Sequence, residues 1–198
     1  MIKTDKSSSK NSSHLYVPTE LFNNEQIKLK KNLQLDVWDL GGKLPHLWVH
    51  HFKGTQGIVF IIDEVATLVD EQKRQSVIQE LLNVIVGNPN IPIVLFINKK
   101  PQLQKELASR IHSISSQLNM NNQQMSQQNQ AKIDTHWLQD NIFDKLDATA
   151  NQELSVRMKI VEGDLINEKG LDQIDIKKGE TNLLSECIEF LISNMKPL

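Results

Sequence analysis

A chain of 198 residues is long enough to bury one sizeable hydrophobic core, and its formal charge of −2 gives no electrostatic reason to expect nucleic acid as a partner. The single cysteine, Cys187, excludes an internal disulfide and a cysteine-rich zinc site. No apolar run of about 18 residues occurs, so we expect no integral membrane segment. The polar N-terminus has no apolar region of a secretory signal. We therefore expect a cytoplasmic protein that associates with membranes only peripherally, through a partner.

Four segments in the first half of the chain are predicted to be strands. Serine, lysine and asparagine dominate residues 1–15, which we expect to be a disordered N-terminal segment. Apolar and polar side chains then alternate over 27–29 and 33–38, a pattern typical of a two-stranded hairpin. Continuous apolar runs over 58–62 and 91–97 favour parallel strands that are buried on both faces.

Helical periodicity appears between and after these strands. It predicts helices over 69–86, 103–118 and 181–195, the last with Thr181 as its N-cap and Cys187 on its buried face. Residues 156–161 are a further strand candidate. The alternation of strands and helices indicates an α/β domain over 16–198, with a mostly parallel sheet between helical layers. An Asn- and Gln-rich stretch, about 119–135, cannot bury apolar surface and is expected to be a loop insert.

Two of the predicted strands run into polar turns, Asp39-Leu40-Gly41-Gly42 and Asn98-Lys99. Around them, the segments Trp38–Gly42, Leu47–Phe52 and Gly54–Asp63 resemble the Arf family of small GTPases in order and spacing. The resemblance implies a three-layer, P-loop-NTPase-like (Ras/Arf-like) G domain, with GTP and Mg²⁺ as cofactors. The long insert after the second turn gives a more distant similarity to the beta subunit of the signal recognition particle receptor.

The resemblance also assigns roles to individual residues. It implies that Thr19 and Asp39 hold the metal ion, Asp39 through water. It implies that Gly42 donates its backbone N–H to the terminal phosphate. Asn98 and Lys99 would belong to the loop that binds the guanine base; the alternative is that these two residues only tie loops together.

Three of the chain's departures from the family pattern bear most directly on nucleotide binding and hydrolysis. Lys43 stands where the family has a water-orienting glutamine, and a lysine cannot accept a hydrogen bond from water. Pro101 replaces the aspartate that reads the guanine edge. No G-x-x-x-x-G-K-[ST] sequence occurs, so we expect the domain to lack its first strand, P-loop and first helix. The strands over 33–38 and 58–62 would then be adjacent and parallel, or separated by a slot one strand wide.

These observations leave two functional hypotheses. The first is a degenerate GTP-binding switch that acts as a protein-interaction scaffold in trafficking or a related assembly, with protein partners bound through the switch-like surface. The second is a truncated form of a genuine GTP-binding and GTP-hydrolysing protein, similar to Arf or to the receptor beta subunit. Trp48 and Phe52 share a face of their segment, and either partner binding or burial accounts for them. His46 and His50 have helical i, i+4 spacing, but no third metal ligand lies nearby in the sequence.

Overall fold

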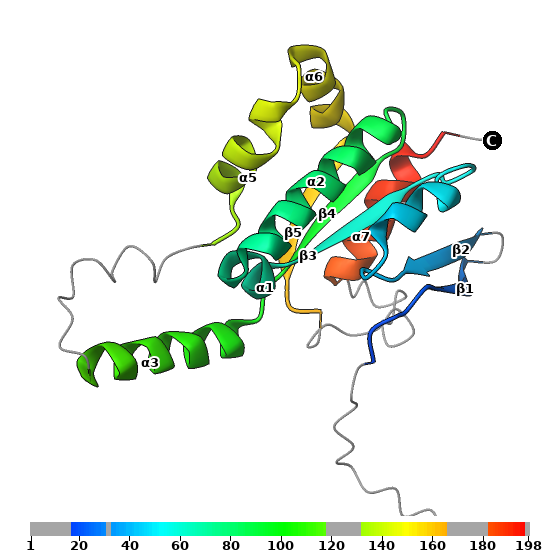
Figure 1. Ribbon diagram of the computed structural model, residues 1–198. Helices are drawn as coiled ribbons and strands as arrows, with labels where there is room; N and C mark the ends of the chain where they lie inside the picture. The colour runs from blue at the N-terminus through cyan, green and yellow to red at the C-terminus, as the bar shows by residue number, and fades with distance from the viewer. Residues whose placement is uncertain (1–16, 31–32, 118–131, 166–181, 197–198) are drawn as a thin grey trace, which may run out of the picture. The chain divides into compact units, whose positions relative to one another are not determined.

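The computed structural model describes residues 17–30, 33–117, 132–165 and 182–196 (Figure 1). The chain forms two compact units, Met1–Lys53 and Gly54–Leu198, and each is described by itself. The predicted disordered segment and residues 119–131 of the predicted insert lie outside the described residues. The remaining insert residues include the buried Ile133 and the first residue of a helix, Thr135.

The first unit is built on the predicted hairpin. Strand β1 (Phe22–Lys30) pairs antiparallel with β2 (Leu33–Leu40), so the alternating pattern identified both strands correctly. After β2 the chain turns at Gly41 and Gly42 and enters a 3₁₀ helix, η1 (Pro45–His51). Pro45 opens this helix, where its missing N–H costs no intrahelical hydrogen bond.

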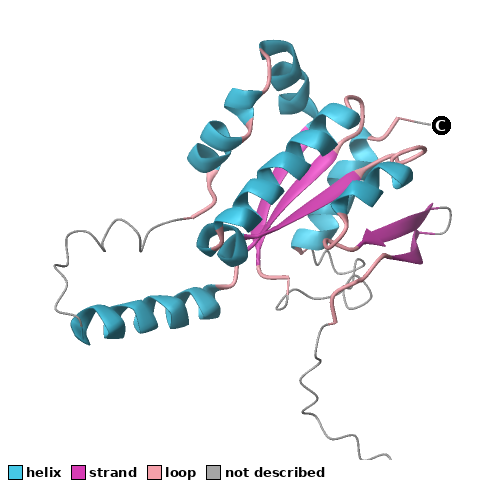
Figure 2. Cartoon of the chain, in the orientation of Figure 1, coloured by secondary structure: helices cyan, strands magenta, loops and turns pink. Residues whose placement is uncertain are grey.

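The second unit contains a three-stranded parallel sheet in the order β3 (Ile58–Asp63), β4 (Ile93–Asn98) and β5 (Met158–Gly163). Figure 2 shows the three strands side by side with helices around them. The predicted α/β class with parallel strands is therefore confirmed. The register places Asp63 beside Asn98 and Asn98 beside Gly163, so the carboxyl ends of all three strands lie at one edge.

Burial differs between β3 and β4. Every residue of β4 from Ile93 to Ile97 is buried, as predicted for a strand with both faces covered. In β3, however, Val59 and Ile61 are 43% and 54% exposed, so burial on both faces was wrong for this strand. The helix on that face, α7 (Leu183–Asn194), packs over β4 and β5, and it buries Val94, Phe96 and Val161 with its own Cys187 and Leu191.

The described residues of the second unit form six further helical segments: α1 (Glu64–Val69), α2 (Glu71–Gly87), α3 (Pro101–Gln117), α5 (Thr135–Asn141), η2 (Phe143–Lys145) and α6 (Ala148–Arg157). Periodicity identified α2, α3 and α7, whereas α1, α5 and α6 were missed, and each of those three begins at an aspartate N-cap. Helix α7 begins after Asn182 instead of Thr181, because Asn182 and Ser185 form a capping box.

The predicted direct pairing of the strands at 33–38 and 58–62 is not observed among the described residues. Strand β2 pairs with β1 in one sheet, and β3 pairs with β4 in another. A hairpin partner already takes up one edge of β2, which removes that edge from any parallel pairing. The alternative, a slot one strand wide, stays a prediction.

Candidate functional site

The turn that follows β2 is held against the preceding segment of the chain. The Gly41 N–H donates to the Leu21 carbonyl at 2.8 Å, and Trp48 Nε1 donates to the Gly41 carbonyl at 3.0 Å. A Cβ on Gly41 would lie only 2.4 Å from the Thr19 carbonyl oxygen and 2.9 Å from that of Glu20. Only glycine therefore fits at position 41, for reasons internal to this unit.

The two predicted metal ligands lie together beside this turn. Thr19 Oγ1 donates a 2.6 Å hydrogen bond to Asp39 Oδ2. A hydroxyl and a carboxylate at this separation are oxygen ligands of the kind that Mg²⁺ binds, with waters and phosphate oxygens completing its coordination. Both groups are thus oxygen donors that suit the metal role implied by the family resemblance, and the role itself stays a prediction. A bound ion would supply positive charge for phosphate oxygens, and the protein's part is to hold the two oxygens on one side of the turn.

Gly42 and Lys43 follow in an open position. No atom lies within 4 Å of a Cβ built on Gly42, so the packing of the first unit gives no reason for glycine at this position. The Lys43 side chain is exposed. Gly41 is thus the glycine that the fold needs, and Gly42 has open space at its Cβ position; its contact with a phosphate stays a prediction.

We expect the two glycines to respond differently to the same substitution. Gly41→Ala should destabilise the first unit by about 1–3 kcal/mol, because the new methyl group meets backbone atoms that cannot turn away. Gly42→Ala should change the unfolding free energy by less than about 0.5 kcal/mol. Urea unfolding followed by the fluorescence of Trp38 and Trp48, in a Trp137→Phe background, measures both. Equal losses for the two variants would contradict this assignment.

An aromatic cluster, which the sequence analysis did not identify, lies on the same unit. The rings of Phe22, Trp38 and His51 have centroids 5.1–5.3 Å apart in all three pairings. Phe22 and Trp38 are nevertheless 50% and 49% exposed. Rings that contact one another and still face solvent form a surface suited to binding another apolar or aromatic group.

The Asn98-Lys99 turn belongs to the second unit and is bonded within it. Asn98 Oδ1 accepts a 3.1 Å hydrogen bond from the Leu165 N–H, and the Lys99 N–H donates to the Gly163 carbonyl at 2.6 Å. The side chain and backbone of the turn therefore join the end of β4 to the end of β5. Pro101 is the first residue of α3, a position that suits proline because the helix needs no N–H there.

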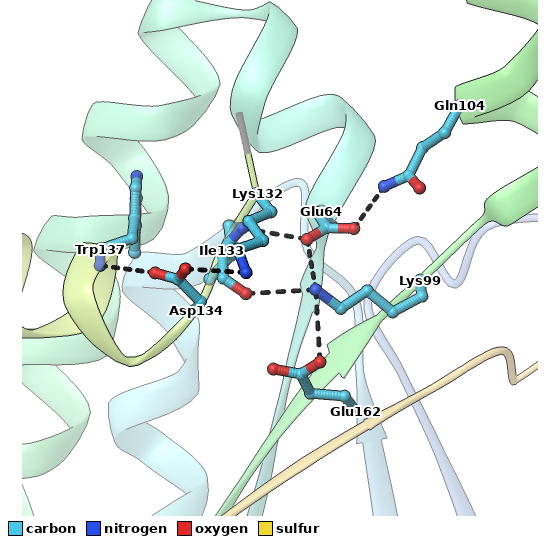
Figure 3. A network of polar contacts seen from close by, with 8 residues as sticks. All are labelled: Glu64, Lys99, Gln104, Lys132, Ile133, Asp134, Trp137 and Glu162. Atoms are coloured by element: carbon cyan, nitrogen blue, oxygen red, sulfur yellow. Dashed lines mark hydrogen bonds and ion pairs between the residues drawn. The ribbon is translucent and has the colours of Figure 1, made fainter. Parts of the chain in front are cut away.

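The Lys99 ammonium is the centre of a network of polar contacts (Figure 3). It forms an ion pair with the fully buried carboxylate of Glu64, donates to the Ile133 carbonyl at 3.2 Å, and lies 3.5 Å from a Glu162 carboxylate oxygen. The neighbouring Lys100 forms an ion pair with Asp63. Sequence reasoning missed Glu64, since a glutamate after a strand is usually solvated.

Two negative observations apply to the described parts of the chain. No described helix is long and apolar enough to cross a membrane. Likewise, no three described His, Cys, Asp or Glu side chains are grouped so as to hold a metal ion.

These features define an α/β protein with a three-stranded parallel sheet, and comparison with known proteins gives its family. The model of the ADP-ribosylation factor (Arf) family matches residues 5–154, so the chain belongs to this family of small GTPases. Its members generally bind GTP and Mg²⁺.

Two curated relatives come from Dictyostelium discoideum. ADP-ribosylation factor K is 36% identical over 90 residues, which cover 43% of this chain and 45% of that protein. ADP-ribosylation factor J is 33% identical over 88 residues, which cover 42% of this chain and 44% of that protein. The chain thus spans less than half the length of these relatives.

Proposed function

We propose that this Arf-family chain is a degenerate GTP-binding switch that acts as a protein-interaction scaffold and binds nucleotide weakly or not at all. The observation that carries the proposal is the state of the Asn-Lys turn. Asn98 and Lys99 are both bonded to other parts of their own unit, and Pro101 begins a helix where a base-reading aspartate is expected. A turn in this state has few groups left for a guanine base.

The phosphate side of the proposal rests on the sequence. The P-loop supplies backbone N–H groups and a lysine to the phosphates, and no such loop occurs in the 198 residues. We propose that this chain performs its role without the first strand, P-loop and first helix of a G domain. Lys43, in place of the water-orienting glutamine, is a second reason to expect no hydrolysis.

The aromatic cluster supports a role in protein contacts. The rings of Phe22, Trp38 and His51 contact one another at tilted angles, and Phe22 and Trp38 are about half exposed to solvent. Tryptophan and phenylalanine are among the residues that contribute most to protein interfaces. We propose that a protein partner binds this surface, in trafficking or a related assembly, and that the protein acts in the cytoplasm, with any membrane association mediated by the partner.

Nucleotide binding tests the proposal. With Mg²⁺ present, a fluorescent GTP analogue should show no micromolar affinity for the 198-residue protein. Each charge-assisted hydrogen bond that a P-loop would make contributes about 1.5–3 kcal/mol, so losing several of them removes most of the affinity of such a site. A Kd below about 10 µM that requires Mg²⁺ and is competed by GDP would overturn the scaffold hypothesis, since about 7 kcal/mol of binding would then remain.

A second candidate function is favoured by the geometry of the first unit. The Thr19–Asp39 hydrogen bond and the open space beside Gly42 are what a site for Mg²⁺ and phosphate requires. In this alternative the chain is part of a longer, genuine GTP-binding protein of the Arf or receptor beta-subunit type. An in-frame G-x-x-x-x-G-K-[ST] upstream in the encoding DNA would favour it, and an expressed longer protein that binds GTP would establish it.

A further inference from the structure

Glu64 is the most deeply buried charged residue among those described, and it follows β3 directly. The residue as a whole is 0% exposed, and its side chain is 1% exposed. One carboxylate oxygen accepts from Lys99 Nζ and, at 3.0 Å, from the Ile133 N–H; the other accepts from Gln104 Nε2. A buried carboxylate is tolerated when it is paired and hydrogen-bonded in this way.

The Lys99 ammonium is surrounded by acceptors of its own unit. An ammonium group has three N–H donors and no acceptor. In Figure 3 three acceptors surround Lys99 Nζ: the Glu64 carboxylate, the Ile133 carbonyl and the Glu162 carboxylate. Two of these contacts are hydrogen bonds, to Glu64 and Ile133, and the third is an ion pair with Glu162 at 3.5 Å, so the ammonium is held by groups of its own unit.

Lys100 provides a comparison within the same turn. The Lys99 and Lys100 side chains are almost equally exposed, at 22% and 26%. Lys100, however, pairs with Asp63, whose side chain is 33% exposed, whereas Lys99 pairs with Glu64, whose side chain is 1% exposed. The two lysines therefore differ in the burial of their partners and hardly in their own accessibility.

We propose that Glu64 is the positioning residue that makes Lys99 a structural cation, by closing a clasp formed by Glu64, Lys99, Gln104, Ile133 and Glu162. The clasp joins the ends of β3, β4 and β5 to two other segments. One is α3, through Gln104, and the other is Ile133, the residue before the N-cap of α5. This inference deepens the proposed function and rests on it, because it names the residue that withdraws Lys99 from any ligand. Neutralising Glu64 should loosen Lys99 at the sheet edge, because only the Ile133 carbonyl and the exposed Glu162 carboxylate would then hold it.

The reactivity of the two lysines tests the clasp. The protein is labelled under native conditions with a limiting amount of an acetylating reagent, and mass-spectrometric fragment ions separate acetyl-Lys99 from acetyl-Lys100. Because an amine must leave its partners in order to react, Lys99 should be acetylated at least about tenfold more slowly than Lys100 in the wild-type protein. A wild-type ratio near one would overturn the proposal.

Variants identify the cause of the difference. Glu64→Gln should raise the Lys99 rate to within about threefold of Lys100, while slow reaction of the buried Cys187 with a thiol reagent shows that the second unit stays folded. Glu186→Gln is the matched control, because Glu186 pairs with Lys159 of β5 on the surface. It should leave the Lys99 to Lys100 ratio unchanged. If the Glu64→Gln protein is folded and its ratio of Lys99 to Lys100 acetylation rates is that of the wild type, the clasp is contradicted. If this variant does not fold, the ratio in the wild-type protein alone decides between the clasp and its absence.

The same labelling separates the clasp from the proposed function. Acetylation without nucleotide measures the clasp alone, and the GTP-analogue titration measures binding alone. A slow Lys99 together with tight, Mg²⁺-dependent nucleotide binding would leave the clasp in place and remove the scaffold hypothesis. If Lys99 is acetylated as fast as Lys100 and no nucleotide binds, the clasp is removed and the scaffold hypothesis stays in place.

Discussion

Replacing Glu64 with leucine is expected to lower the free energy of unfolding of the Gly54–Leu198 unit by about 3–5 kcal/mol, the usual cost of removing one partner of a buried ion pair. The loss arises because the Lys99 ammonium, the Ile133 N–H and the Gln104 amide lose their shared acceptor. The desolvation cost of these donors would then no longer be offset by hydrogen bonds.

Cys187 provides a measurement that is specific for this unit. It is the only cysteine in the chain, it is 2% exposed, and it packs in the core between α7 and the sheet. Burial also raises the pKa of its thiol, which disfavours the reactive thiolate. Its rate of reaction with a thiol reagent as urea increases therefore reports the opening of the second unit alone.

Two further variants test whether the loss comes from leaving one charge of the buried Glu64–Lys99 pair without its partner. Glu64→Leu combined with Lys99→Met removes both charges, and hydrophobic replacement of a whole buried pair is often close to neutral, so the double variant should recover more than about 1 kcal/mol. Glu186→Leu, at the exposed pair with Lys159, should cost less than about 1 kcal/mol. A cost for Glu64→Leu no larger than that of Glu186→Leu would contradict the proposed importance of the buried carboxylate.

The strands of this fold were predictable from local sequence, whereas the contacts of Glu64 were not. Strands β1, β2 and β4 were predictable because periodicity of side-chain polarity is a local property of a few consecutive residues. The partners of Glu64 lie 35, 40 and 69 positions away, and no local pattern brings them together. The aromatic cluster was missed for the same reason, since its members come from β1, β2 and η1.

The missed helices carried a local signal that was too short to read by periodicity. Helices α1 and α5 have six and seven residues, less than two turns, so neither presents a complete apolar stripe. Their capping aspartates, Asp63 and Asp134, each accept a bond from a backbone N–H three residues later, and this N-cap pattern would have located both. The pairing of Thr19 with Asp39, by contrast, followed from the family resemblance and not from local chemistry.

Arg157 is the second residue for which a large effect on stability is expected. It is the last residue of α6, and its guanidinium donates to the Ile85 carbonyl at 3.0 Å and to the Ile91 carbonyl at 2.9 Å. The first of these carbonyls lies in the last turn of α2, where the helix has no partner of its own for it. The second lies just before β4. Arg157 thus joins α2, β4 and the start of β5 through one planar group.

Burial of this group has a cost that its hydrogen bonds must offset. Desolvation lowers the pKa of the Arg157 guanidinium, and its Nε has no partner among the described residues. The charge also lies at the C-terminal end of α2, where the helix dipole favours a cation. Because the fork of N–H groups spans two carbonyls at once, lysine should replace it only in part.

Arg157→Met should therefore lower the free energy of unfolding of the second unit by about 2–4 kcal/mol, the sum expected for two hydrogen bonds from a charged donor less the relief of desolvation. Arg157→Lys should recover part of this loss. Arg74→Met is the matched control, because Arg74 pairs with Glu71 on the surface of the first turn of α2 and should cost less than about 1 kcal/mol. Urea-dependent labelling of Cys187 measures all three variants. If Arg157→Met and Arg74→Met cost the same, the two carbonyl contacts do not stabilise the unit, and the end of α2 must be held by its own Asn88 cap, whose amide donates to the Val84 carbonyl.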